Sequence, residues 1–144
     1  MPKNLSDSRA IDVARLFWGN RSIISSSRMP HIHLVTSADL AENMEIPQVL
    51  AALVGELSAQ ESIHSAAIKA YHSLKSVWAM GEGAPGGFAH CEVRILAGRP
   101  PDLRKKVADA MYSRMRKLFE GSLREGAVSL TLEVREMDAE AYRK

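Results

Sequence analysis

The sequence predicts an α+β fold in which two β-α-β units form a four-stranded sheet with both helices on one face. Two observations lead to this prediction. An extended, alternating segment, an amphipathic helix and a second extended segment follow one another, and the same order then recurs. A cluster of glycine and proline over residues 81–87 separates the two units. Each crossover should be right-handed and make its two strands parallel.

The first unit starts at residue 30. Residues 30–37 alternate between two sets of side chains, which predicts a strand, and proline is permitted at its first position because it need not donate to the ladder. Residues 46–57 predict an amphipathic helix with Pro47 in its first turn. Residues 66–80 form a second extended region. The apolar positions of the helix are Ile46, Val49, Leu50, Leu53, Val54 and Leu57.

The second unit repeats this order. Residues 88–96 predict a strand with one apolar face, Pro100 and Pro101 begin a helix that should stop at Gly121, and residues 127–136 predict the last strand. With both helices on one face, the other face of the sheet is uncovered and includes apolar groups. We therefore expect an oligomer.

The charge of the chain is unevenly distributed. Residues 1–28 contain five basic and two acidic residues, whereas residues 29–144 contain fourteen basic and fifteen acidic ones. The folded part therefore shows no charge bias toward nucleic acid or an anionic membrane, and we expect neither as a partner. The single cysteine, Cys91, excludes an intramolecular disulfide and is typical of a reducing cytoplasm, where we expect the protein. No apolar run approaches the roughly 20 residues of a membrane span.

Residues 1–28 are basic and rich in serine, and we expect an N-terminal extension that is disordered or outside the mature chain, followed by one domain at 29–144. The extension also loosely matches a transit peptide. Met29 offers a second in-frame start, and its removal would expose Pro30 as a secondary amine. Such an amine can act as a general base near neutral pH when burial or cations lower its pKa. Pro2 competes formally, but no strand follows it.

Several short motifs of the folded part resemble, in this order and spacing, those of the 5-carboxymethyl-2-hydroxymuconate isomerases, a branch of the tautomerase superfamily. The resemblance extends from residue 29 to about residue 136. The motifs are Pro30-His31, Ile46-Pro47, Ile68-Lys69, Trp78-Ala79-Met80-Gly81, Phe88-Ala89-His90 and Ala97-Gly98-Arg99.

The resemblance implies a homotrimeric isomerase that uses no cofactor and has the same β-α-β repeat. Its substrate would be 5-carboxymethyl-2-hydroxymuconate, a dienol with several carboxylates that arises in homoprotocatechuate degradation, a branch of aromatic catabolism. Pro30 would be the catalytic base, which takes the enol proton and returns a proton to the distal carbon. Arg99 would bind one substrate carboxylate, and Lys69 would bind another from a position where the family usually has arginine.

Two departures from the family pattern leave the substrate open. Lys69 keeps the charge but lacks the planar fork of arginine that suits a carboxylate. Tyr71 also stands where arginine is common, and there the charge is lost. A tautomerase with a different 2-oxo acid or dienol substrate is therefore an alternative. If residues 1–28 are retained, the nitrogen of Pro30 is an amide, and the alternative is a non-catalytic trimeric binding protein.

The histidines have two interpretations. We expect His31 and His90 to line or support a pocket near Pro30. A metal site is not expected, because His31, His33 and His90 lack an acidic or cysteine partner at suitable spacing.

Other polar residues have ordinary structural interpretations beside the functional ones. Arg99 could be a solvated loop residue, and Lys69 an unremarkable lysine on a polar strand face. Cys91 alternates with inward residues and should be a small buried side chain. The cations of the second helix predict a solvated face rather than a nucleic-acid site. They are Arg104, Lys105, Lys106, Arg114, Arg116 and Lys117.

Overall fold

The computed structural model describes residues 30–143, so the predicted N-terminal extension lies outside the described residues. The elements are β1 (Pro30–Ser37), the 3-10 helix η1 (Ala41–Glu45), α3 (Ile46–Ser58), the 3-10 helix η2 (Ser65–Ala67), β2 (Lys69–Lys75), β3 (Gly87–Leu96), α4 (Pro101–Leu118), α5 (Glu120–Arg124) and β4 (Val128–Met137).

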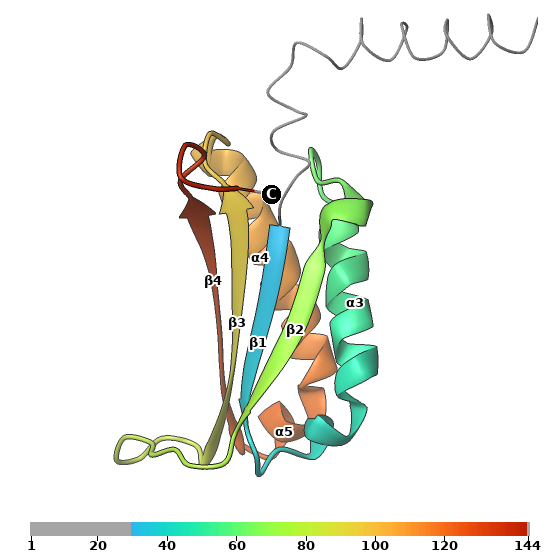
Figure 1. Cartoon of the computed structure of the whole chain (residues 1–144). Coiled ribbons are helices and arrows are strands. Elements are labelled where there is room, and N and C mark those ends of the chain that lie inside the picture. The colour runs from blue at the N-terminus through green and yellow to red at the C-terminus, as the bar shows by residue number, and fades with distance from the viewer. Residues whose placement is uncertain (1–29, 144) are drawn as a thin grey trace, which may run out of the picture.

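Four strands form one mixed sheet in the order β2-β1-β3-β4. Each β-α-β unit contributes a parallel pair, β1 with β2 and β3 with β4, and the antiparallel pairing of β1 with β3 joins the units. Helices α3 and α4 lie side by side on one face of the sheet (Figure 1). The predicted α+β fold of two β-α-β units is therefore confirmed.

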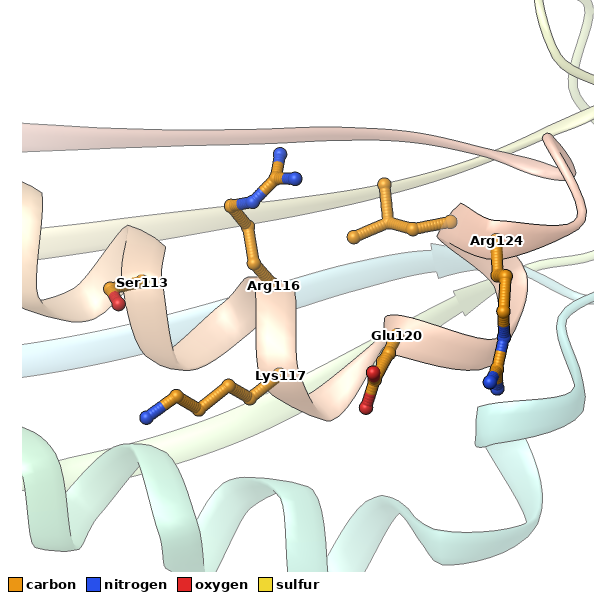
Figure 2. A pocket seen from close by; sticks show the side chains of 6 residues that line it. Ser113, Arg116, Lys117, Glu120 and Arg124 are labelled. Carbon is orange, nitrogen blue, oxygen red and sulfur yellow. The ribbon is translucent and has the colours of Figure 1, made fainter.

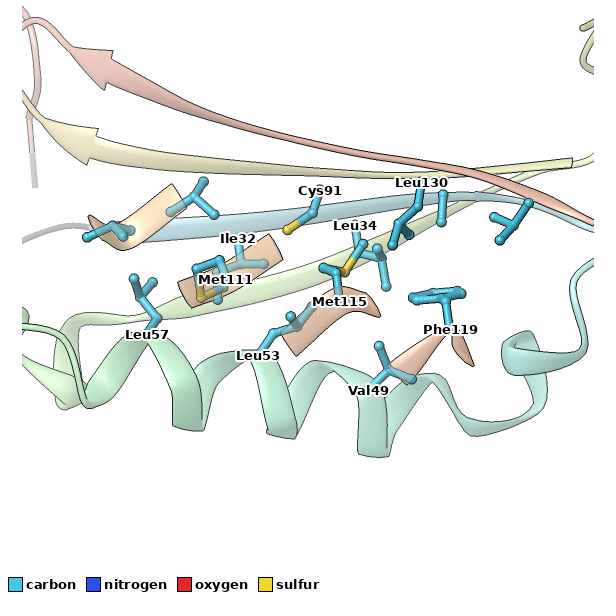
Figure 3. Packing of buried hydrophobic residues seen from close by; sticks show 14 of the residues in the cluster. Ile32, Leu34, Val49, Leu53, Leu57, Cys91, Met111, Met115, Phe119 and Leu130 are labelled. Atoms are coloured by element: carbon cyan, nitrogen blue, oxygen red, sulfur yellow. The ribbon is translucent and has the colours of Figure 1, made fainter. Parts of the chain in front are cut away.

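The core lies between the sheet and these two helices (Figure 3). The alternating residues of the strands and the helical apolar stripe meet there, as with Leu34 of β1, Leu53 of α3 and Met111 of α4, which are all fully buried. Cys91 is also fully buried, as predicted, and burial raises the pKa of its thiol to about 12. Each large side chain in this layer stabilises the fold by about 2 kcal/mol through its burial.

The second extended region is shorter than predicted. The strand spans Lys69–Lys75 rather than residues 66–80, and a 3-10 turn over Ser65–Ala67 precedes it. The strand is short because its pairing partner, β1, is short. β2 pairs only with β1, and β1 ends at Ser37, opposite Lys75. Beyond that residue no backbone remains for β2 to pair with.

The prediction that the second helix stops at Gly121 is wrong. The long helix α4 ends earlier, and the short helix α5 contains Gly121. This glycine lies close to Glu42 of η1, whose carboxylate accepts hydrogen bonds from the backbone nitrogen (3.2 Å) and the hydroxyl (2.5 Å) of Ser122. The chain leaves the helical region at Gly126, where φ is +66°, a conformation that favours glycine.

The sheet face opposite the helices is more polar than the sequence indicated. By register its apolar and aromatic members are Val35, Tyr71, Phe88, Leu96 and Met137, so the expected apolar groups are present but in the minority. The rest of this open face is charged or polar, which weakens the argument that hydrophobic burial alone requires a partner there. The polar members include His31, His33, Lys69, Ser73, Lys75, His90, Glu92, Arg94, Ser129, Thr131, Glu133 and Arg135.

Candidate active site

One end of the sheet brings together three residues that the sequence singled out. Pro30 is the first residue of β1, is buried, and lies opposite Ile95 of β3. Lys69, the first residue of β2, lies opposite the next residue of β1. The carboxyl end of β3 leads into the loop that carries Arg99. Pro30, Lys69 and Arg99 therefore share one end of the sheet because β3 runs antiparallel to β1 and β2.

His31 lies on the open face of the sheet at this end, between two cations. Lys69 flanks it on one side and Arg94 on the other. Burial, followed by the positive charges of Lys69 and Arg94, lowers the pKa of His31 below its usual 6.5, so the ring is neutral at neutral pH. Its Nε2 atom is buried and has no hydrogen-bond partner among residues 30–143. His31 thus follows Pro30 directly in β1, and its role in a pocket near Pro30 stays a prediction.

The C-terminal segment reaches the same end of the sheet (Figure 1). Asp138 holds a turn there, since its carbonyl accepts hydrogen bonds from the backbone nitrogens of Ala141 and Tyr142. The ring of Tyr142 contacts His31 edge to face, with 6.4 Å between the ring centroids. Tyr142 is therefore a neighbour of the site that sequence reasoning missed.

Lys69 is exposed and lies on the open face, where its charge is available to an anion. Tyr71, two residues along the same strand, stacks on His33 with 4.6 Å between the ring centroids and 27° between the planes. The neighbouring Ser73 is hydrogen-bonded to the Nε2 atom of His33 (2.8 Å). Position 71 therefore has an aromatic contact within the sheet face.

Arg99 is not a solvated loop residue. Its residue exposure is 8%, and its guanidinium is held by oxygen atoms on two sides. Nε donates to the hydroxyl of Ser62 (3.2 Å), Nη2 to the carbonyl of Ser62 (3.3 Å), and Nη1 to the carbonyl of Leu96 (3.1 Å). Burial lowers the pKa of Arg99, and the negative charge of Glu136 opposes that shift. The structure thus fixes this cation close to the end of β3.

Within one chain, His90 does not lie beside Pro30, contrary to the prediction. It pairs with Val35, well along β1 from Pro30. Its Nδ1 atom is hydrogen-bonded to the hydroxyl of Thr131 (2.7 Å), and its Nε2 atom lies 3.5 Å from the carboxylate of Glu133. The sequence showed that His90 was on the open face but not how far along the sheet its register would place it.

An ion-pair network covers the adjoining part of the open face. Glu92 accepts hydrogen bonds from Nε of Arg94 and, at 3.4 Å, from Nη1 of Arg135. Burial alone would raise the pKa of Glu92, but these two arginines outweigh it and lower that pKa. Sequence reasoning missed this network, although the alternation of Glu92 and Arg94 along a predicted strand was a usable signal.

A hollow of about 760 Å³ lies at the other end of the molecule, along α4 and α5 (Figure 2). Three cations, Arg116, Lys117 and Arg124, line it together with Glu120. It is remote from Pro30 and is not part of the candidate site. Among residues 30–143, no three histidine, cysteine or acidic side chains are grouped so as to hold a metal ion, and no helix is long and apolar enough to cross a membrane.

Comparisons with known proteins agree on the fold. A crystal structure of a 5-carboxymethyl-2-hydroxymuconate isomerase from Deinococcus radiodurans R1 matches with a TM-score of 0.75 and 26% identity, covering 84% of this chain and 92% of the other. A 5-carboxymethyl-2-hydroxymuconate delta-isomerase matches with a TM-score of 0.70 and 19% identity, covering 84% and 90%. A macrophage migration inhibitory factor-like protein from Entamoeba histolytica matches with a TM-score of 0.56 and 16% identity, covering 80% and 94%. A search of curated protein sequences finds no match.

The sequence itself supplies the family assignment. Residues 30–144 match the family described as 5-carboxymethyl-2-hydroxymuconate isomerase, and the match begins at the proline that opens β1. This range takes in the whole sheet, both long helices and the cations around Pro30. The chain therefore belongs to the 5-carboxymethyl-2-hydroxymuconate isomerase family and is an isomerase of the tautomerase superfamily.

Proposed function

We propose that the chain that begins at Pro30 catalyses the keto-enol tautomerisation of 5-carboxymethyl-2-hydroxymuconate, with the amine of Pro30 as general base. One observation carries the proposal: Pro30 opens β1 at the end of the sheet that also holds Lys69 and Arg99, and the family match starts at the same residue. The proposed setting is aromatic catabolism in the cytoplasm, and the reaction needs no cofactor.

The proposed reaction transfers a proton from the 2-hydroxyl group to the distal carbon and shifts the double bonds between them. The lone pair of the Pro30 amine takes the proton of the 2-hydroxyl group, the C2–O bond becomes a carbonyl, and the electron pair moves through the diene. The resulting ammonium returns a proton to the distal carbon, where a C–H bond forms. Burial and nearby cations lower the pKa of an amine, which would keep the base unprotonated near neutral pH.

Positive charge at this end of the sheet suits a substrate with several carboxylates. Arg99, held in one orientation by Ser62 and Leu96, would direct its positive charge to one carboxylate, and Lys69 would attract another as a point charge. The same charges would stabilise the dienolate that forms as the proton leaves. His31 is neutral there and would support the site without adding a third charge.

The first experiment compares two chains that differ by one residue before Pro30. One begins at Met29, so that removal of the methionine leaves Pro30 as the N-terminus, and the other carries an alanine between the two. Turnover of the dienol is followed by ultraviolet absorbance, and intact mass confirms each N-terminus. The alanine should reduce kcat by roughly 10²- to 10⁴-fold, because the nitrogen of Pro30 becomes an amide. Equal activity of the two chains would refute Pro30 as the base.

The intact mass of the protein from its natural host would show whether the chain starts at Pro30 or includes residues 1–28. A mass that starts at Pro30 agrees with the proposed enzyme. A mass that includes residues 1–28 would favour a non-catalytic trimeric binding protein, because the nitrogen of Pro30 would then be an amide.

A second candidate is a tautomerase whose substrate has fewer carboxylates. It is favoured by the stacking of Tyr71 on His33, which gives position 71 an aromatic contact in place of a charge. Turnover of the tricarboxylate dienol should be compared with turnover of simple 2-hydroxydienoates and phenylenolpyruvate. The variant Lys69→Arg should shift preference toward the tricarboxylate. No shift in preference would count against a carboxylate role for residue 69.

The proposed assembly is a homotrimer with the site near a subunit interface. Support comes from a structural neighbour described as a symmetric trimer of fused 4-OT, which has a TM-score of 0.53 and 18% identity. Light scattering of the chain that begins at Pro30 should give three times the monomer mass. A monomer at micromolar concentration would contradict the proposal.

A further inference from the structure

A second residue, Ser62, bears on how Arg99 is oriented. Ser62 lies in the loop between α3 and β2, and its backbone φ of +65° is the only positive value of a non-glycine residue among residues 30–143. It occupies the third position of a four-residue turn that is closed by a hydrogen bond from the nitrogen of Ile63 to the carbonyl of Gln60 (3.3 Å). A positive φ at that position favours glycine or asparagine, so a serine there is conformationally costly.

The contacts of Ser62 show what the serine contributes. Its hydroxyl accepts from Nε of Arg99 (3.2 Å) and its carbonyl accepts from Nη2 (3.3 Å). Together they bind one edge of the guanidinium as the two oxygens of a carboxylate would. The carbonyl of Leu96 holds Nη1 (3.1 Å), so the plane of the guanidinium is fixed from two directions. A glycine would adopt the same turn without strain but would lose the hydroxyl.

We infer that Ser62 is a positioning residue, which orients the guanidinium of Arg99 for a substrate carboxylate from the loop between α3 and β2. The inference rests on the proposed function of Arg99 as a carboxylate-binding residue. Ser62 acts through Arg99. An outlying backbone conformation that is kept in place by contacts to a binding residue is the kind of strain that accompanies functional sites.

The test uses two substitutions that both suit a positive φ. Ser62→Gly removes the hydroxyl acceptor, whereas Ser62→Asn keeps a side-chain oxygen. Both variants should fold, because glycine and asparagine tolerate a positive φ. Ser58→Ala is the matched control, because its hydroxyl bonds to the carbonyl of Val54 and lies outside this contact. In the chain that begins at Pro30, the Nε–H proton of Arg99 is followed by NMR exchange, with Arg99→Lys to assign its signal.

The expected result is faster exchange of that proton in Ser62→Gly and slow exchange in Ser62→Asn. In Ser62→Gly, the KM for the dienol should rise roughly three- to tenfold, and kcat should change less than KM. In Ser62→Asn, KM should stay close to the wild-type value. The dissociation constant of tricarballylate, a tricarboxylate that cannot tautomerise, should follow KM. Unchanged exchange, or an unchanged dissociation constant in Ser62→Gly, would overturn the inference.

The binding and turnover readouts separate the two proposals. If the wild-type chain binds tricarballylate with the expected dependence on Ser62 but does not convert the dienol, the proposed reaction fails and the positioning of Arg99 stands. If the dienol is converted and Ser62→Gly leaves KM and tricarballylate binding unchanged, the positioning fails and the reaction stands. A wild-type chain that neither binds nor converts these carboxylates refutes both.

Discussion

Replacing Gly87 with alanine should destabilise the protein strongly, because the start of β3 has no room for a Cβ atom. A Cβ at this position would lie 2.6 Å from the hydroxyl oxygen of Ser37 and 2.6 Å from a carboxylate oxygen of Asp39. Asp39 is exposed and can move away, but Ser37 is fully buried. Its hydroxyl accepts from the backbone nitrogen of Phe88 (2.8 Å) and donates to the carbonyl of Phe88 (3.3 Å).

The magnitude follows from these contacts. Overpacking costs about 1 to 3 kcal/mol, and each of the two broken hydrogen bonds costs about 0.5 to 1.5 kcal/mol, so Gly87→Ala should lower the free energy of unfolding by about 2 to 6 kcal/mol. Urea unfolding at a fixed protein concentration measures the change. Gly86→Ala is the matched control, since a Cβ there comes no closer than 4.0 Å to Asp39. Equal stability of the two variants would refute the reasoning.

Three further predictions concern the core, the histidines and the cysteine. Met111→Ala should lower the free energy of unfolding by about 2 to 5 kcal/mol in the same urea assay, because Met111 is fully buried between the sheet and α3. A change below 1 kcal/mol would mean that this layer is not packed as described. The pKa values of His31, His33 and His72 are all lowered, first by burial, so the unfolded chain binds more protons. Stability should therefore be fully present above about pH 6.5 and decline as the pH falls through the lowered values, which urea midpoints at several pH values would measure. Cys91, buried and with its pKa raised to about 12, should resist iodoacetamide at pH 8 in the folded protein and react in urea, as intact mass would show. Rapid labelling of the folded protein would contradict its burial.

The positions of the strands and helices followed from local patterns. Alternation over residues 30–37 and 88–96, and helical spacing after Pro47, depend on neighbours within one or two turns, so they could be interpreted without knowing the rest of the chain. The predictions were wrong at the ends of two elements, where contacts with segments distant in the sequence fix the boundary. The strand after residue 66 is short because β1 ends at Ser37. Gly121 does not end a helix because it lies inside the short helix α5, where Ser122 is hydrogen-bonded to the distant Glu42.

The candidate site divides in the same way. Pro30, Lys69 and Arg99 were found from the sequence because each stands within a recognisable motif. The role of Ser62 could not be predicted from the sequence. Its positive φ is a property of the folded backbone, and its contact with Arg99 joins two loops that are 37 residues apart in the sequence. No periodic pattern records such a contact.

The sequence alone thus determined the α+β architecture, the family resemblance and the residues of interest around Pro30. Only the tertiary structure decided which of them lie together. The antiparallel register of β1 and β3 brings the loop of Arg99 to the end of the sheet where Pro30 lies, and the same register carries His90 away to Val35. Secondary structure follows from side chains that are neighbours along the chain, whereas a site depends on the pairing of strands that are separated by many residues.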